Sequence, residues 1–486
     1  MERSSKRPDY LLRFWLLALC ITIGLGGLYF LPEQILGWDI NKVDLLGDLR
    51  RGQTDSLAIS TDDPRALSQQ ARSQTAEVRK REAIYEQLKQ EQVKSGSSTS
   101  STEEDSDTTR HTPKNIELSE ANTLSDMTAG HDGLQHFFSQ LRQRNGLHRP
   151  IRIAVLGDSF IEGDIFTGAL RSALQARYGG SGIGWMPITS ETAGFRQTIR
   201  HEFKGWKDHN QFHSKGKYPL PGHYYTGSEG DWARYTLVKG ATPCAEATIY
   251  YRSPSTTTLS VTVNGGEPTY IELPPSDGLT AHQLASGSIS SLRFSLASGA
   301  SGFICYGVSL DGASGVSLDN FSLRGNSGLL LGSLDTELTR SFAHARPYDL
   351  IILQYGLNAI GPKQLDYSGY GKQFGRSLHH LRSLLGRADY LLLGVSDRGT
   401  KSDGQVITMP AVRAMEQAQL RLAADQGIVF WSTRAAVGRL GGIGKLAERG
   451  WAAKDYTHLS HRGGKELAKQ FLDAFLLEEK YYDAIK

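Results

Sequence analysis

Strand-like and helix-like patterns alternate through most of the chain after residue 131, and this alternation restricts the possible folds more than any other feature. Short apolar runs are typical of buried strands, and apolar residues spaced three and four apart are typical of amphipathic helices. Strands alternating with helices indicate an α/β domain whose parallel sheet has helices on both faces. The predicted strands are Arg152–Leu156, Leu350–Gln354, Tyr390–Val395 and Ile428–Trp431, and the predicted helices include Leu134–Leu141, Phe166–Leu174, Phe374–Leu385, Val412–Ala424 and Leu467–Phe475.

A different pattern interrupts this alternation between residues 195 and 315. Short strands of alternating polarity recur there, separated by Gly, Ser, Thr and Pro, and no helical period is present. Such strands indicate a β-sandwich or jelly roll. We therefore expect a β-rich domain at residues 195–315, inserted between two parts of the α/β domain at residues 131–194 and 316–486.

The N-terminal region carries an uncharged apolar run, Phe14–Leu31, close to the ~20 residues that a membrane-spanning helix needs. Four basic residues precede this run, which favours a cytoplasmic N-terminus and export of the rest of the chain. No cleavage site of the A-x-A type follows, so we predict an uncleaved single-pass anchor within residues 1–33 rather than a signal peptide. The basic residues are Arg3, Lys6, Arg7 and Arg13.

Residues 34–130 are predicted to form a largely disordered or partly helical spacer. The stretch from Ser56 to Asn115 is poor in large apolar residues and cannot bury enough surface to fold. Within it, Arg79–Gln92 has the composition of a solvated helix, with a partner helix as the alternative. The spacer would hold the following domains away from the membrane.

Composition excludes several kinds of partner. The formal net charge is +3, so there is no basic excess that would indicate nucleic acid. The sequence contains no HExxH, paired CxxC or Walker-type loop, and no metal, nucleotide or other cofactor is expected. Outside the apolar run, the cysteines are Cys244 and Cys305, which form either one disulfide or two buried thiols.

Four polar stretches lie at or just beyond predicted strand ends, where ligands gather in open α/β sheets. They are Gly157-Asp158-Ser159, Arg324–Gly328, Gly356-Leu357-Asn358 and Asp455–His458. Each stretch alone is a weak signal, and Ser159 in that place is also expected to begin the following helix.

Together these stretches supply the groups that acyl transfer needs. Ser159 requires a base to become a nucleophile, His458 can be that base, and Asp455 can hold its imidazole in the required tautomer. The backbone N–H groups of Ser159 and Gly325 and the side-chain amide of Asn358 can bind the oxyanion.

This set resembles the four blocks of the SGNH (GDSL-type) hydrolase family, from about Leu134 to the C-terminus apart from the insertion. It is most similar to a bacterial envelope branch that includes peptidoglycan O-acetylesterases. Segments such as FWSTRAAVG and DYTHLSHRGG, and the β-rich insertion after the first block, carry this closer likeness. The resemblance implies a flavodoxin-like parallel sheet, Ser159 as nucleophile, His458 as base, Asp455 as orienting carboxylate, and Gly325 and Asn358 as oxyanion donors.

Some assignments within the blocks have competitors. Gly328 competes with Gly325 in the second block, with Gly312 and Gly315 as remoter alternatives. His461 lies three residues after His458, but the spacing from Asp455 favours His458. Ala359 stands where many relatives carry Asp, which removes no catalytic group.

Aromatic residues in and just before the insertion are candidates for stacking on sugar rings, although aromatics in β-domains more often belong to the core. These candidate substrate-binding residues are Trp185, Trp206, Tyr224, Tyr225 and Trp232.

The sequence therefore predicts an envelope esterase that removes O-acetyl groups from peptidoglycan or another cell-surface polysaccharide. The resemblance places it in the bacterial inner membrane, with the catalytic domain in the periplasm or otherwise outside the cytoplasm. The alternatives are a lipase, thioesterase or acyltransferase on the same fold, or a glycan-binding envelope protein without turnover. The oligomeric state is left open by the sequence.

Overall fold

The computed structural model describes residues 34–35, 38–39, 83–90 and 121–485. The predicted membrane-spanning run Phe14–Leu31 lies outside these residues. Among the helices that are described, none is long and apolar enough to cross a membrane. Strands β1 (Gln34–Ile35) and β2 (Trp38–Asp39) form an antiparallel pair in a unit of residues 1–71, and the elements described below belong to a second unit.

One mixed sheet forms the centre of the α/β domain. Five of its strands are parallel, and β3 runs antiparallel at one edge. In chain order the parallel strands are arranged 2-1-3-4-5, which is the flavodoxin-like order. The predicted parallel sheet is thereby confirmed. In spatial order the strands are β16 (Val316–Ser322), β4 (Ile151–Gly157), β17 (Leu350–Gln354), β18 (Asp389–Leu393), β21 (Val429–Trp431) and β3 (Ser125–Asp126).

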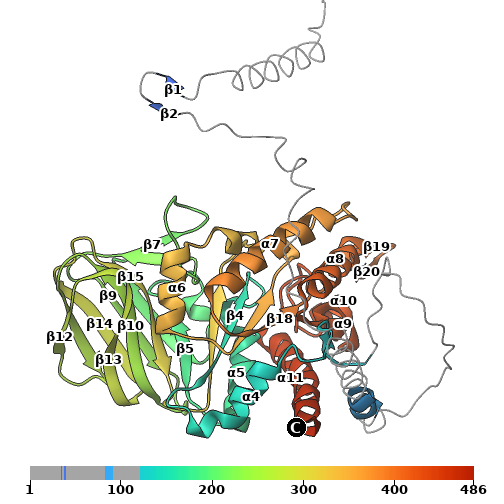
Figure 1. Cartoon of the computed structure of the whole chain (residues 1–486), viewed down its shortest axis with the longest axis horizontal. Coiled ribbons are helices and arrows are strands. Elements are labelled where there is room, and N and C mark those ends of the chain that lie inside the picture. The colour runs from blue at the N-terminus through green and yellow to red at the C-terminus, as the bar shows by residue number, and fades with distance from the viewer. Residues whose placement is uncertain (1–33, 36–37, 40–82, 91–120, 486) are drawn as a thin grey trace, which may run out of the picture. The chain divides into compact units, whose positions relative to one another are not determined.

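Helices cover both faces of this sheet (Figure 1). Helices α4, α5 and α9 contact the C-terminal helix α11. Helices α6 and α8 both contact α7 and form a second group. This coverage explains why every residue of β17 is buried. The helices are α4 (Gln135–Gln143), α5 (Thr167–Tyr178), α6 (Thr336–Ala345), α7 (Ser368–Leu384), α8 (Pro410–Gln426), α9 (Thr433–Arg439), α10 (Gly442–Glu448) and α11 (His461–Ala484).

The β-rich segment forms two packed sheets with a core of their own. One sheet has the order β13-β10-β15-β8-β7 with β5 also paired to β15, and the other has the order β12-β11-β14-β9-β6. The strands are β5 (Gly182–Met186), β6 (Ile199–Lys204), β7 (Lys207–Asn210), β8 (His223–Thr226), β9 (Trp232–Leu237), β10 (Cys244–Ser253), β11 (Thr257–Val263), β12 (Thr269–Leu273), β13 (Ser276–Ile289), β14 (Ser291–Ser298) and β15 (Ile304–Asp311). Cys244 and Cys305 are buried free thiols.

This sandwich begins earlier than residue 195, where the sequence pattern placed it, because β5 already pairs with β15. The glycines of β5 concealed the strand in the sequence. Gly184 has a φ of 75°, and a Cβ there would lie 2.3 Å from Asp319 Oδ1 and 2.7 Å from the backbone oxygen of Leu318. Only glycine allows β5 to approach the parallel sheet so closely.

Arg346, just after α6, joins the sandwich to the α/β domain. Its buried guanidinium donates to Asp311 Oδ2 on β15 at 2.6 Å and to Asp319 Oδ2 on β16 at 2.6 Å. Tyr348 Oη also donates to Asp319 Oδ2. Because the two carboxylates come from different domains, this one cation fixes the sandwich against the parallel sheet.

The helix at residues 83–90 packs on the α/β domain rather than being wholly solvated. Tyr85 is buried, and its hydroxyl donates to the backbone oxygen of Leu124 at 2.7 Å. Its ring meets Tyr481 of α11 edge-on, with centroids 5.7 Å apart. The polar composition that predicted a solvated helix describes its exposed face, whereas a few apolar side chains hold the other face.

Asp389 at the start of β18 makes the stability of the domain depend on pH. Burial raises the pKa of Asp389 to about 7, although its Oδ2 accepts the N–H of Phe137 at 2.7 Å. The folded state therefore keeps a proton that the unfolded chain releases between about pH 4 and 7, so stability falls as pH rises through this range. From pH 5 to 8 the wild type should lose about 2 to 3 kcal/mol more unfolding free energy than Asp389→Asn.

Urea unfolding at pH 5 and pH 8 measures this difference. Asp425→Asn, which changes an exposed carboxyl on α8, is the control and should follow the wild type. Equal pH dependence of the wild type and Asp389→Asn would contradict the assignment.

Candidate active site

Ser159, His458 and Asp455 form a hydrogen-bonded chain at the carboxyl end of the parallel sheet. The Oγ of Ser159 lies 3.2 Å from Nε2 of His458, and Nδ1 of His458 lies 2.7 Å from Oδ2 of Asp455. The structure thus brings the three predicted residues together from segments about 300 residues apart. The spacing and the order of partners are those of a nucleophile, a base and an orienting carboxylate. His461 is instead the first residue of α11.

Ser159 lies in a turn directly after β4 and does not begin a helix, contrary to the expectation from its sequence. A short 3₁₀ helix, η2 (Glu162–Asp164), follows this turn, and α5 begins only at Thr167. Asp164, the last residue of η2, has a left-handed φ of 63°, so the chain does not continue as one helix into α5. The Ser159 hydroxyl is therefore not occupied as a helix cap.

The loop carrying Asp455 and His458 is fixed by its own backbone. Asp455 Oδ1 accepts the N–H groups of Thr457 and His458 at 3.0 and 3.1 Å. Partial burial opposes ionisation of Asp455, but these bonds and that from the His458 side chain hold its pKa below the ordinary value. The carboxylate is consequently charged at neutral pH and can stabilise a protonated imidazole. The side chains of His458 and Asp455 are 44% and 50% exposed, so a large substrate can reach them.

Asp158 connects the first of the four blocks, at residues 157–159, to the third, at residues 356–358. It is buried, and it accepts the N–H of Phe160 at 2.9 Å and the amide Nδ2 of Asn358 at 2.8 Å. Burial raises its pKa to about 6 in spite of these bonds. Asn358, on the short helix η5 (Leu357–Ala359) after β17, also donates to the backbone oxygen of Asn326 at 3.1 Å. These two bonds occupy both N–H donors of the Asn358 amide, so the predicted oxyanion donor is held by the first and second blocks with no N–H left over.

The second block separates Gly325 from its competitors. The N–H of Gly328 donates to Asn326 Oδ1 at 2.8 Å, and Gly312 donates to Ser181, so both N–H groups are occupied. Gly315 precedes β16, at the opposite end of the sheet from Ser159. Gly325 is exposed with a φ of 79°, and neither its N–H nor that of Ser159 has an acceptor among the described residues. These two N–H groups remain available to bind an oxyanion.

Sequence reasoning missed an ion pair that links these blocks. Arg324 Nη2 donates to Glu162 Oε2 at 2.5 Å, so the residue before Gly325 is tied to η2. Glu162 follows the first block and Arg324 lies in the second, and no motif contains them as a pair. Only their proximity in the fold reveals the contact.

A hairpin of β19 (Gly399–Ser402) and β20 (Gln405–Thr408) supports the catalytic loop. The N–H of Gly399 donates to the backbone oxygen of Tyr456 at 2.8 Å, and Tyr456 has the unusual φ of 52°. A Cβ at position 399 would lie 2.8 Å from Tyr456 Cβ and 2.7 Å from Val406 Cγ1. Gly399 is therefore needed for the hairpin to contact the loop.

Gly399→Ala should displace the loop that carries Asp455 and His458. It should lower kcat about tenfold or more, because a small displacement of a reacting group slows the reaction strongly. KM for p-nitrophenyl acetate should change little. The matched control is Gly369→Ala on α7, where a Cβ meets no atom within 4 Å. An unchanged kcat in a folded Gly399→Ala protein would show that the hairpin does not position the loop.

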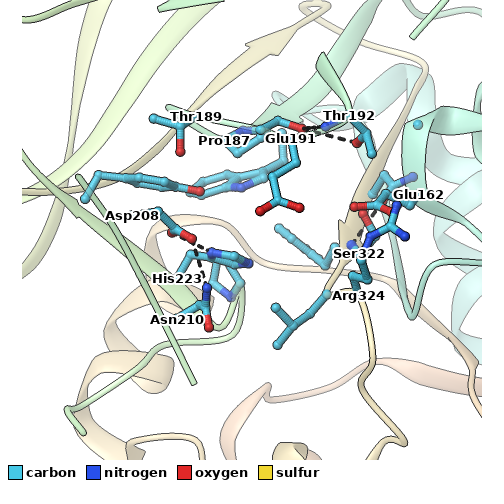
Figure 2. A pocket seen from close by; sticks show the side chains of 18 of the residues that line it. Glu162, Pro187, Thr189, Glu191, Thr192, Asp208, Asn210, His223, Ser322 and Arg324 are labelled. Carbon is cyan, nitrogen blue, oxygen red and sulfur yellow. Dashed lines mark hydrogen bonds and ion pairs between the residues drawn. The ribbon is translucent and has the colours of Figure 1, made fainter. Parts of the chain in front are cut away.

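A cavity of about 780 Å³ adjoins this site and is lined by both the sandwich and the α/β domain (Figure 2). We call it the side cavity. Gly325 and Glu162 belong to its wall, which places it beside the first and second blocks. Among the described residues, no group of three or more His, Cys, Asp or Glu side chains is arranged to hold a metal ion.

The aromatic candidates divide between packing and the cavity wall. Trp185, Trp206 and Tyr225 line the side cavity but are almost completely buried, with little ring surface left for a sugar. Tyr224 stacks on His209 and Tyr218 instead. Trp232 lies beneath Arg234 and Arg293. Neither Tyr224 nor Trp232 lines the side cavity.

Comparison with known proteins gives likeness in structure alone. No family model matches the chain, and no curated protein matches it. A solved structure of a peptidoglycan O-acetylesterase covers 74% of this chain and 99% of its own, with a TM-score of 0.62 and 22% identity. A family two carbohydrate esterase from Cellvibrio japonicus covers 58% and 99%, with 11% identity and a TM-score of only 0.25. The chain therefore has the fold of this solved peptidoglycan O-acetylesterase.

Proposed function

We propose that the protein is a serine esterase that removes O-acetyl groups from peptidoglycan or another cell-surface polysaccharide. The observation that carries the proposal is the chain Ser159 Oγ to His458 Nε2 at 3.2 Å and His458 Nδ1 to Asp455 Oδ2 at 2.7 Å. The proposed acetyl substrate is supported by the likeness to the peptidoglycan O-acetylesterase. The apolar run Phe14–Leu31 supports an anchor that keeps the enzyme at the envelope.

In the proposed reaction, His458 Nε2 takes the proton of Ser159 as Oγ attacks the acetyl carbonyl carbon. The N–H groups of Ser159 and Gly325 stabilise the oxyanion, and the amide of Asn358 joins them by releasing its bond to Asp158 or Asn326. Collapse breaks the ester bond, and the sugar oxygen leaves with the proton from His458. Water, deprotonated by His458, then attacks the acetyl-serine, and the bond from Oγ to the acetyl carbon breaks as His458 returns the proton to Ser159 and acetate leaves. The exposure of His458 and Asp455 favours hydrolysis over transfer, because transfer requires that water be excluded.

Acetate release from O-acetylated sacculi and from p-nitrophenyl acetate tests this function. The purified protein should release acetate from both, and Ser159→Ala should release it from neither. Hydrolysis of p-nitrophenyl acetate without release from sacculi would indicate an esterase with another substrate. Equal release by the wild type and Ser159→Ala would exclude the proposed nucleophile.

A further inference from the structure

The side cavity is well placed to hold the part of a substrate next to the reacting ester. Glu162 in its wall is three residues from Ser159, and His458 is close enough to influence the charge of Glu162. The cavity volume of about 780 Å³ is far larger than an acetyl group needs. A small ester would leave this space unused.

Glu191 is an exposed acidic residue of the cavity wall. Figure 2 shows its carboxylate pointing into the cavity, between Asp208 and Arg324. Glu162 is paired with Arg324, and Asp208 accepts hydrogen bonds from Asn210 and lies 2.8 Å from Nδ1 of His223. In the described part of the chain, by contrast, Glu191 has no hydrogen bond or ion pair. An unpaired carboxylate in a concave wall favours a cationic ligand.

Arg196 in the same wall is a cation that lacks a close anionic partner of its own. Its side chain is only 7% exposed, and Nη1 lies 3.7 Å from Asp164 Oδ2. Asp164 is already held by two bonds from Arg171, at 2.9 and 3.2 Å. The other contact of Arg196 is a weak one, from Nη1 to the sulfur of Met186. A guanidinium has five N–H donors, and Nε and Nη2 have no acceptor among the described residues, so an anionic oxygen would complete this site.

We propose that the side cavity binds a peptide portion of the glycan substrate, with an ammonium group on Glu191 and a carboxylate on Arg196. The inference rests on the proposed function, and it narrows the proposed substrate to glycan strands that carry peptides. Peptidoglycan offers this chemistry, since its sugars carry peptides with free amino and carboxylate groups. A neutral surface polysaccharide offers neither charge.

Binding tests the inference without requiring turnover. The probes are soluble disaccharide-peptides released from sacculi by a muramidase, and the same disaccharide without peptide. In the Ser159→Ala background, calorimetry should show that Glu191→Gln weakens binding of the disaccharide-peptide about tenfold. The control Glu272→Gln changes an exposed glutamate on β12, outside the cavity wall, and should bind as tightly as the parent. Equal affinity with and without Glu191→Gln, or no binding to either protein, would overturn the inference.

Kinetics separate this inference from the proposed function. With Ser159 intact, Glu191→Gln should raise KM for O-acetylated sacculi several-fold while leaving kcat and the hydrolysis of p-nitrophenyl acetate unchanged. The defect should vanish on O-acetylated glycan strands from which an amidase has removed the peptides. A defect that persists on such strands would place the recognised group on the sugar and refute the peptide site. Failure of the wild type to release acetate from sacculi would instead reject the proposed function, and the binding measurement would still decide the cavity.

Discussion

Ser159→Ala is expected to lower kcat by on the order of 10³- to 10⁶-fold, because it removes the oxygen that attacks the ester. The hydroxyl lies 3.2 Å from His458 Nε2 in a half-buried turn and has no other hydrogen bond within the described part of the chain, so folding should be unaffected. His458→Ala should cost about as much, and Asp455→Asn as much or less. The double variant Ser159→Ala/His458→Ala should be scarcely slower than either single variant, since the two residues act as one unit.

Steady-state kcat for p-nitrophenyl acetate and for O-acetylated sacculi measures these losses. Ser383→Ala, which removes an exposed hydroxyl on α7, is the matched control and should retain full activity. Thermal unfolding of each variant verifies that the fold is retained. If the losses of the two single variants added in the double variant, Ser159 and His458 would not be acting together.

Arg346→Met is expected to destabilise the protein by about 3–5 kcal/mol, the usual cost of removing one partner from a buried ion pair. Methionine roughly fills the space but leaves the carboxylates of Asp311 and Asp319 buried without their cation. The bonds from Arg346 hold the pKa of Asp311 below the ordinary value in spite of burial, so the carboxylate is charged at neutral pH. The loss therefore comes from uncompensated charge as well as from broken hydrogen bonds.

Urea unfolding at pH 7 checks this value, with Arg340→Met as the control because Arg340 is exposed on the same helix, α6. Adding Asp311→Asn and Asp319→Asn to Arg346→Met should restore part of the lost stability, since it removes the stranded charges. A stability of Arg346→Met within about 0.5 kcal/mol of the wild type would contradict the role given to this network.

Local patterns predicted the parallel sheet because a strand covered by helices must be apolar along its length, as β17 is. They predicted the triad because the chemistry of Ser159, Asp455 and His458 depends on residue type and on position after a strand. The pattern failed at β5, whose glycines conceal a strand that forms by approach to Asp319. It also failed to show that Tyr85 packs on α11, because a few apolar side chains do not alter the composition of a polar segment.

The sequence by itself determined the α/β alternation and the set of groups for acyl transfer, since periodicity and residue chemistry are properties of short segments. Only the tertiary structure decided that Gly325 rather than Gly328 has its N–H available, and that Asp158 holds Asn358. It alone also showed that Arg346 joins the two domains and that Glu191 and Arg196 share one cavity. These facts depend on which polar groups already have partners, and partners distant in the sequence meet only when the chain has folded.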